Sequence, residues 1–414
     1  MSNTPANKNP YAALKIPEFK NFITGRFIYI MGLRMTATVI GWWIYQLTNS
    51  PLALGFVGLS EVIPALSLAL YAGHYIDMNE KRRLLLRCIL LYLGCVILLI
   101  TLSSSFTSSY LSNWSISILI CCVIAGTGAI RAFSGPTFSA LLSQVVPKNM
   151  LPSAAAISSA TWLIGSICGH ALAGFLIAFI GINHSFFVIL FFVISGYIFL
   201  TRLSIKPVFV TVATKTWQSV KEGISYVFKT KEILGALSLD LFAVLFGGAV
   251  ALVPIFAKDI LHIGPIGFGW LNAAADIGSI ITVTILTIRP LRGKQGLLLF
   301  YAVAGFGVCI ILFALSEIFW LSFAALLMSG CMDGISVIVR GTILQLKTPD
   351  NLRGRVMSVN SMFINSSNEL GQFESGVAAK LMGTVTSVVF GGCMTIAVVI
   401  VTWLKAPSLR KMEY

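Results

Sequence analysis

Charge is the property that this sequence has least of. Only 11% of its 414 residues are Asp, Glu, Lys or Arg, whereas 57% are hydrophobic. About a quarter of the residues of a typical soluble domain are charged. So few charges cannot cover a chain of this length with a hydrated surface. The composition therefore excludes a water-soluble fold and indicates a membrane protein.

Several motifs that carry catalysis or ligand binding are also missing. The eight cysteines include no C-x-x-C pair, which argues against a disulfide framework and against a zinc site. The sequence contains no G-x-x-x-x-G-K-[ST] phosphate loop, no nucleophile–base pair and no metal-ligand spacing. We therefore expect neither an enzyme nor a bound cofactor or metal. Residues 1–20 lack an apolar core, so no cleavable signal peptide is expected.

Long hydrophobic runs are what the sequence has instead. A helix needs about 20 apolar residues to cross a bilayer, and twelve such runs can be read from the chain. They lie at 22–46, 52–73, 84–104, 115–140, 153–180, 184–203, 233–257, 266–288, 296–315, 318–341, 356–380 and 385–404. The predicted fold is an all-α membrane protein with twelve transmembrane helices in two six-helix halves.

The net charge of +14 is concentrated on one side of these spans. If the loops alternate between the two membrane faces, one face has almost all the lysines and arginines, and the other has only Lys258 and Lys380. Basic loops remain in the cytoplasm, so both termini are predicted to be cytoplasmic. This asymmetry explains the positive charge without a nucleic-acid partner, and it makes the lipid bilayer the expected partner.

The two halves repeat one another in sequence. The segment that starts at Pro147 aligns without a gap with the segment that starts at Pro349. Identical residues in this alignment are Asn149 and Asn351, Ser159 and Ser361, Gly169 and Gly371, and Gly174 and Gly376. Arg131 and Asp333 each lie 16 residues before the respective proline, so opposite charges occupy equivalent depths. Duplicated halves that meet around polar groups are typical of secondary transporters.

This repeat predicts three parts in the chain: a six-helix half at 1–203, a linker at 204–232 and a second six-helix half at 233–414. The linker is the only long polar stretch. In it, Trp217, Val220, Ile224, Val227 and Phe228 fall on one helical face, which predicts an amphipathic helix at the membrane surface. Its simplest role is a strap between the halves, and regulation is the alternative.

Charged residues inside the predicted spans differ in sign between the halves. The first half has Arg26, Arg34, Glu61 and Arg131, and the second has Asp240, Asp276, Asp333, Arg340, Glu369 and Glu374. Each is a functional candidate, because charges are costly inside a bilayer. Arginine suits bidentate binding of carboxylates or catecholates, and carboxylates in a partly dehydrated cavity can carry protons. Alternatively, the charges pair across the two halves and only hold one conformation closed.

Two short motifs resemble signatures of the major facilitator superfamily. Residues 73–83, GHYIDMNEKRR, resemble the G-x-x-x-D-R-x-G-R-R loop between helices 2 and 3, with Met78 in place of the arginine and Glu80 in place of the glycine. Residues 165–174, GSICGHALAG, resemble the antiporter signature G-x-x-x-G-P-x-x-G-G, with His170 in place of the proline and Ala173 in place of a glycine. Small residues at this spacing let two helices pack closely.

Three longer stretches extend the resemblance over most of the chain. They are WWIYQLTNSPLALGFVGLSEVIPAL, LSLDLFAVLFGGAVALVPIFAKDIL and TPDNLRGRVMSVNSMFINSSNELGQFESG. They resemble bacterial major facilitator proteins of the enterobactin-exporter-like group, which also includes macrolide efflux pumps. The resemblance runs from about Pro17 to about Leu409. It implies outward transport and a location in a bacterial cytoplasmic (inner) membrane.

The resemblance also implies that helices 1, 4, 7 and 10 line a central cavity. The expected substrate contacts are Arg34, Arg131, Trp42 and Trp162. The expected proton carriers are Asp240 and Asp333, with Asp276, Glu61, Glu369, Glu374 and His170 as secondary candidates. The expected conformational switch consists of Gly73, Asp77, Arg82, Arg83, Arg353, Arg355, Gly165, Gly169 and Gly174. For His170, whose side chain titrates near neutral pH, the alternative is a hydrogen-bonded packing residue.

The predicted function is proton-coupled export of a small amphipathic metabolite by a monomer, with a siderophore as the lead substrate. A multidrug or macrolide efflux pump is the alternative, and it would use the same cavity with more aromatic and fewer arginine contacts. A membrane receptor or scaffold without transport is the alternative of another class. Such a protein would need no polar groups in the middle of both halves.

Overall fold

The structure is a computed structural model that describes residues 12–206, 216–289, 293–349 and 352–413. Within these ranges the secondary structure is helical, and no strand is present. The long helices are α1 (Pro17–Thr48), α2 (Pro51–Met78), α3 (Lys81–Leu102), α5 (Asn113–Val145), α6 (Leu151–Thr201), α8 (Lys231–Phe246), α10 (Gly264–Ile288), α11 (Gln295–Leu315), α12 (Phe319–Lys347), α13 (Arg353–Met382) and α14 (Thr384–Lys405). The shorter elements are η1 (Ala12–Lys15), α4 (Ser105–Tyr110), η2 (Lys148–Met150), α7 (Thr216–Lys229), η3 (Ala249–Leu252), α9 (Val253–Ile255), η4 (Phe256–Ile260) and α15 (Pro407–Arg410).

Ten helical segments of the described chain are long and apolar enough to cross a membrane. One of them, Lys148–Thr201, contains two predicted spans, because helical geometry is interrupted at Gly181, where φ is 78° and ψ is 174°. Only glycine adopts this backbone conformation without strain. The more polar α13 is the remaining predicted span. The helices therefore match the twelve hydrophobic runs in number and order.

Contacts divide the described chain into two compact units. The first unit contains residues 12–39 and 63–206, and the second contains 40–62, 216–289, 293–349 and 352–413. Both divisions before the linker fall inside helices, in α1 and in α2. The end of α1 and the start of α2 therefore pack with the helices that follow the linker.

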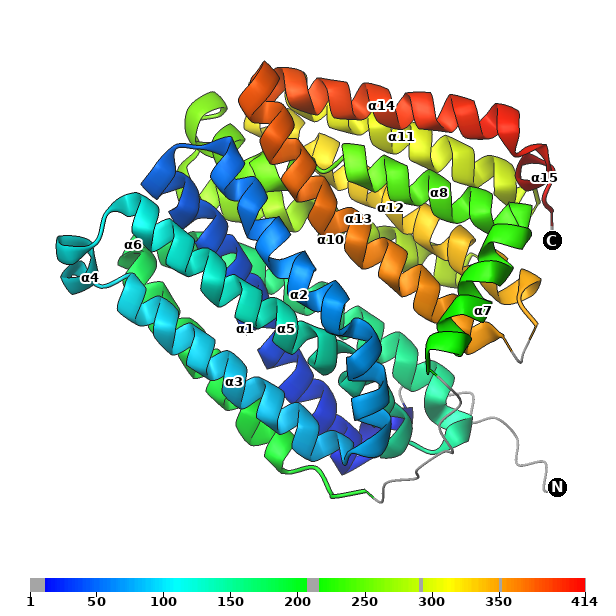
Figure 1. The fold of residues 1–414 in the computed structure, drawn as a ribbon, viewed down its shortest axis with the longest axis horizontal. Coiled ribbons are helices and arrows are strands. Elements are labelled where there is room, and N and C mark those ends of the chain that lie inside the picture. Colours follow the sequence, from blue (N-terminus) through cyan, green and yellow to red (C-terminus); the bar gives the residue numbers. More distant parts are fainter. Residues whose placement is uncertain (1–11, 207–215, 290–292, 350–351, 414) are drawn as a thin grey trace. The chain divides into compact units, whose positions relative to one another are not determined.

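An aromatic cluster forms the core of the first unit. The ring of Tyr29 on α1 lies 5.7 Å from the ring of Tyr92 on α3 and 5.8 Å from that of Phe138 on α5. The ring centroid of Phe22 lies 6.0 Å from that of Phe138. These rings are almost completely buried, and α3 packs along both α5 and α6 (Figure 1).

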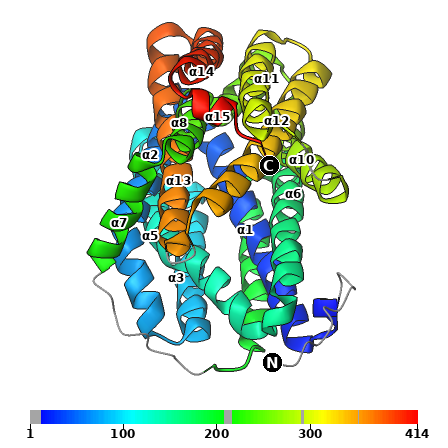
Figure 2. The same cartoon turned by 90° about the vertical axis from the view of Figure 1, so that its right-hand side faces the viewer.

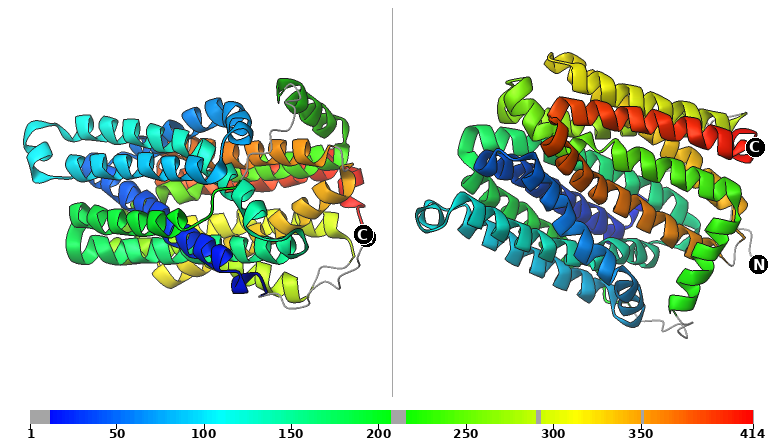
Figure 3. Two further views of the ribbon diagram at one scale, coloured as in Figure 1. Left: turned by 90° about the horizontal axis from the view of Figure 1, so that it is seen from below. Right: turned by 45° about the horizontal axis from the view of Figure 1, so that its top comes forward.

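Close helix pairs also build the second unit. α12 packs on α10 and α11, α14 packs on α11, and α8 packs on α13 and α14; the right-hand view of Figure 3 shows α11 and α14 side by side. The approach of α10 to α12 depends on glycine, because a Cβ atom at Gly330 would lie 1.9 Å from the carbonyl oxygen of Ala275. Small residues at helix contacts allow such an approach in membranes.

Equivalent glycines of the sequence repeat make equivalent contacts. Gly169 on α6 packs against Met31 and Arg34 of α1, and Gly371 on α13 packs against Val244 and Leu245 of α8. α1 and α8 are the first helices of the two predicted halves. The first part of α6 is the fifth predicted span and α13 is the eleventh, so each is the fifth span of its half. The duplication is thus visible in the packing as well as in the sequence.

Candidate functional site

A buried ion pair joins two membrane helices of the second unit. Asp240 on α8 pairs with Arg340 on α12. The two residues are 6% and 2% exposed, so the pair is almost fully removed from solvent. Arg340 therefore does not extend to the membrane surface, although its place near the end of a span would have allowed this. A charge buried at this depth is costly unless it is paired.

A small cavity adjoins this pair. It has a volume of about 10 Å³ and is lined by Asp240, Asp333 and Ser336 together with apolar side chains of α8, α11 and α12. That volume is close to the smallest that can hold one water molecule. The two carboxylates predicted to carry protons are therefore brought to the same cavity.

Asp276 on α10 lies within electrostatic reach of Asp333. Hydrogen bonds join its helix to α12, two of them from hydroxyl groups. The hydroxyl of Ser279 donates to the carbonyl of Gly330, and the hydroxyl of Thr282 donates to the carbonyl of Cys331, each at 3.1 Å. Asp240 and Asp333 thus line one cavity, and Asp276 of α10 lies close enough to Asp333 to interact with it.

The two glutamates of α13 have different surroundings. Glu369 is buried and accepts a hydrogen bond of 3.0 Å from the side-chain amide of Gln372. Glu374 is half-buried.

Arg34 is the best-defined cationic group of the first unit. Its guanidinium carbon lies 4.9 Å from the ring centroid of Trp162 on α6, which is a favourable cation–π geometry. Gly169, which lies about two turns after Trp162 on α6, packs against the Arg34 Cβ atom. Trp162 is 38% exposed. The structure therefore brings two of the predicted substrate contacts together as a stacked pair.

His170 is buried beside this pair and is hydrogen bonded to Thr38, with 2.6 Å between the Thr38 hydroxyl and Nδ1. Thr38 also donates to the carbonyl of Arg34 at 3.0 Å. A short polar chain therefore links the helix turn of Arg34 to α6. This geometry fits the packing alternative for His170.

The other predicted site residues of the membrane region are more scattered. Arg131 on α5 and Glu61 on α2 are half-buried and take part in polar interactions. Trp42 is buried in the second unit, where its ring lies 5.3 Å from that of Phe268. Arg26 hydrogen bonds to Ser158.

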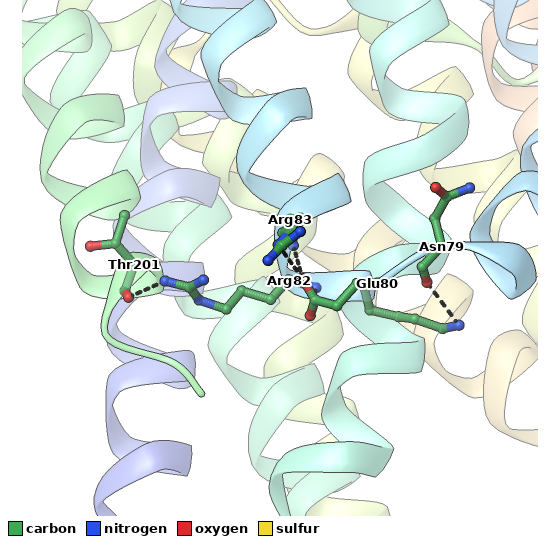
Figure 4. A network of polar contacts seen from close by, with 6 residues as sticks. Asn79, Glu80, Arg82, Arg83 and Thr201 are labelled. Atoms are coloured by element: carbon green, nitrogen blue, oxygen red, sulfur yellow. Dashed lines mark hydrogen bonds and ion pairs between the residues drawn. The ribbon is translucent and has the colours of Figure 1, made fainter. Parts of the chain in front are cut away.

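The loop between α2 and α3 forms a local polar network (Figure 4). Glu80 caps α3 by accepting hydrogen bonds from the backbone N–H groups of Arg82 at 2.9 Å and Arg83 at 2.7 Å. Arg82 reaches across to the carbonyl of Thr201 at the end of α6, at 2.5 Å. Glu80 stands where the superfamily signature has a glycine, and its carboxylate satisfies N–H groups that a helix start leaves unpaired.

Asp77 and Gly73, the other predicted switch residues of this loop, are exposed at the end of α2. The backbone carbonyl of Asp77 accepts a hydrogen bond of 3.1 Å from the buried Lys81. A Cβ atom at Gly73 would meet no atom within 4 Å among the described residues. Gly73 therefore does not mediate a close helix contact in this conformation, whereas Gly165 and Gly169 pack tightly against α1.

The amphipathic linker helix α7 lies beside the start of α13 (Figure 2). Glu222 of α7 forms an ion pair with Arg355, one of the predicted switch residues. Gly223 packs on the backbone of Arg355, and the Tyr226 hydroxyl donates to the carbonyl of Lys347 at 2.5 Å. Arg353 is exposed. The sequence predicted the helix but not the contact that docks it.

A second polar network joins the end of α1 to η4, a turn of π-helix. Tyr45 donates to the carboxylate of Asp259, and Lys258 donates to the side-chain oxygen of Asn49 at 2.8 Å. The Lys258 ammonium also lies 5.1 Å from the Tyr45 ring centroid. Asn49, a member of the network, and His262, which follows η4, have positive φ values of 47° and 49°. π-Helical turns and strained residues gather at functional sites.

Sequence reasoning did not identify this second network or the role of Arg340. One signal was available, because Lys258 is one of two lysines that break the charge asymmetry of the loops. The pairings themselves depend on which sides of the helices face each other. Among the described residues, no group of three or more His, Cys, Asp or Glu side chains could hold a metal ion.

The comparisons with known proteins agree with this architecture. The profile of a family described as transmembrane secretion effector, of the MFS type, matches residues 8–414. An MFS-type transporter of Bacillus subtilis, YfmI, is 21% identical over 81% of this chain and 83% of its own length. The enterobactin exporter EntS of Salmonella typhi is 22% identical over 96% of this chain and 94% of its own length.

Solved structures show the same fold. A D-xylose–proton symporter superposes with a TM-score of 0.73 at 13% identity, covering 96% of this chain and 99% of its own. The nucleoside transporter NupG superposes with a TM-score of 0.69 at 14% identity, covering 95% of this chain and 99% of its own. These relatives are transporters and not enzymes. The chain is a multi-pass membrane protein and belongs to the transmembrane secretion effector family of the major facilitator superfamily.

Proposed function

We propose that this transporter is a proton-driven exporter of a small amphipathic anion, with a siderophore as the lead cargo. The separation of charge between the two units supports this proposal most directly. The first unit has Arg34 stacked on Trp162, whereas the second has Asp240 and Asp333 on one cavity. One unit thus has the chemistry to bind an anion, and the other has the chemistry to bind a proton.

The stacked pair suits an aromatic anion. Trp162 covers one face of the Arg34 guanidinium, while the N–H groups lie in the guanidinium plane and can donate to a carboxylate or catecholate. The exposed Trp162 ring offers a surface for an aromatic group of the same cargo. The match over 96% of the chain to an enterobactin exporter is consistent with this class of cargo. Arg131 is the second proposed anion contact.

The acidic cavity suits proton coupling. In this conformation the charge of Asp240 is balanced by Arg340. If transport separates the pair, the buried carboxylate must find another positive partner, and a proton from the adjoining cavity fulfils that need. Asp333 lines the same cavity and is the proposed entry point for the proton. The glutamates Glu61, Glu369 and Glu374 are secondary candidates, whereas the buried hydrogen bond of His170 to Thr38 favours a packing role for that residue.

The network of Tyr45, Asn49, Lys258 and Asp259 fits alternating access. We assign the end of α1 and η4 to the outer side, because the basic loops place both termini in the cytoplasm. Within the second unit, the starting turns of α2 also pack closely on α13, where a Cβ at Gly55 would lie 3.1 Å from the carbonyl of Phe373. These contacts keep the outer side closed, and cargo release outward requires that they break.

Efflux of drugs or macrolides is the second candidate. An aromatic cluster in the first unit favours it, because Phe133 lies 6.3 Å from Tyr71 and 5.9 Å from Tyr75, measured between ring centroids. Tyr71 is exposed and could contact an uncharged aromatic or hydrophobic cargo. We propose that the protein works as a monomer in the cytoplasmic membrane of a bacterium in either case.

Transport into inside-out vesicles would test the proposal, with enterobactin and erythromycin as alternative cargos. Arg34→Gln should weaken enterobactin binding by about 2–5 kcal/mol, the cost of losing a good charged contact. Asp333→Asn should leave binding measurable but abolish the dependence of transport on the pH gradient. Arg87→Gln, an exposed arginine on α3, is the matched control. Enterobactin transport that persists after the pH gradient is collapsed would refute proton coupling, and erythromycin transport without enterobactin transport would favour the second candidate.

A further inference from the structure

The face of α7 that points away from the second unit combines apolar and basic side chains. Ile224 and Phe228 are 37% and 60% exposed on it. Lys221 and Lys229 are exposed beside them, and Lys231 is exposed at the start of α8. Helical spacing puts residues 221, 224, 225 and 228 on one side. A helix with apolar side chains flanked by lysines has the chemistry that binds an anionic membrane surface.

The opposite face of α7 is already occupied by protein. Val227 is fully buried in the hydrophobic core of the second unit, and Gly223 packs on the backbone at Arg355. Tyr226 is tied to α12 through the carbonyl of Lys347. α7 is therefore docked firmly along one side, and its exposed apolar residues are not turned toward the core of the unit.

We propose that the exposed face of α7 binds the headgroups of anionic phospholipids, and that this contact regulates transport through the Glu222–Arg355 pair. Arg355 lies in the first turn of α13, so lipid that holds α7 at the membrane surface also stabilises the position of this end of α13. The inference rests on the cytoplasmic placement of α7 in the proposed function. The rate of transport then depends on the fraction of anionic lipid in the membrane.

Charge and apolar area contribute separately to this contact. Ile224 and Phe228 insert among the acyl chains near the headgroups and are indifferent to lipid charge. Each lysine near an anionic surface contributes an attraction that corresponds to about a fivefold change in the docking equilibrium. Removing Lys221, Lys229 and Lys231 should therefore reduce the preference for anionic lipid by about two orders of magnitude, while leaving the apolar insertion in place.

The test uses the full-length transporter in proteoliposomes, with an environment-sensitive fluorophore on a single cysteine at Ser225. Proteoliposomes of phosphatidylcholine are compared with proteoliposomes that also contain phosphatidylglycerol, and brominated lipids report contact by quenching. We expect stronger quenching and faster transport with phosphatidylglycerol. Both effects should be lost when Lys221, Lys229 and Lys231 are changed to Gln, and kept in the control Lys405→Gln with Lys411→Gln. Glu222→Gln should keep the lipid-dependent quenching but lose the lipid-dependent rate.

Quenching that is equal in the two lipid compositions would overturn the inference, as would an effect reproduced by soluble inorganic phosphate. So would a triple lysine variant that retains full dependence on phosphatidylglycerol. The failure of the topology is recognised separately, because an impermeant thiol reagent would then reach the Ser225 cysteine from outside intact cells. If the reagent does not reach it and quenching is independent of lipid charge, only the lipid inference fails and the proposed function stands.

Discussion

Single residues decide how charge is tolerated inside this membrane protein. Asp240 and Arg340 are each almost fully buried, and each provides the other's countercharge. A buried ion pair contributes little net stability, because the free-energy cost of removing two charges from water is about as large as the gain from their attraction. What it does is make each partner dependent on the other.

Neutralising one partner should therefore be worse than neutralising both. Arg340→Gln leaves a buried carboxylate without its countercharge and should destabilise the folded protein by about 3–5 kcal/mol. The double variant Asp240→Asn with Arg340→Gln should recover most of that loss. Thermal unfolding of the detergent-purified proteins measures both. Ser67→Ala, which removes a hydroxyl that bonds only within α2, is the control. Additive effects of the two substitutions would mean that the pair is not energetically coupled.

The helices α1 and α2 limit how the protein can change conformation. α1 and α2 each contribute to both compact units, so the two helices cannot move as rigid members of one half without breaking contacts at one end. The end of α1 is tied to η4 by Tyr45 and Lys258. η4 is a short π-helical turn next to a residue with positive φ, which are features of a segment held in place by its surroundings.

Loosening this contact should favour the state that is open on the outer side. Tyr45→Phe and Lys258→Gln each remove one hydrogen bond, which is worth about 0.5–1.5 kcal/mol and corresponds to roughly a twofold to tenfold population change. Distances between spin labels at Ser109 and Met382 report the opening. We expect a larger population of long distances in the double variant than in the parent. The distance distribution should remain unaltered in Thr342→Val, which loses only a hydrogen bond within α12. No change in the double variant would show that this network does not control the outer side.

The distribution of lysine and arginine predicts the membrane orientation of the whole molecule. Lysines and arginines gather in alternate loops, and this asymmetry is known to set membrane orientation. We therefore expect the net charge of +14 to reflect topology rather than a binding partner.

Accessibility to an impermeant thiol reagent measures this orientation on a cysteine-free background. A cysteine at Ser109 in the short helix α4 should be labelled from outside intact cells, because the segment between α3 and α5 carries no basic residue. A cysteine at Ser204, which follows Arg202, should be labelled only after the membrane is permeabilised. Both positions are exposed, so access of the reagent depends on the membrane side alone. The reverse labelling pattern would invert the topology and with it the proposed outer and inner sides.

The sequence by itself determined the class of fold, the number of spans, the duplication and the sign of charge in each half. These properties follow from local composition and spacing, such as the runs of apolar residues and the aligned segments after Pro147 and Pro349. They need no knowledge of which helices touch. The family resemblance read from the motifs was confirmed by the match over residues 8–414.

Only the tertiary structure decided the pairings. Asp240 was predicted as a proton carrier, but its partner Arg340 lies on another helix and depends on how α8 and α12 are rotated toward each other. The same holds for Glu222 with Arg355, Lys258 with Asn49, and Arg34 with Trp162. Hydrophobic periodicity identifies a helix but constrains its rotation weakly when most of its surface is apolar, as it is for a helix in lipid. Partner choice therefore follows from side-chain packing between helices, which the linear sequence does not display.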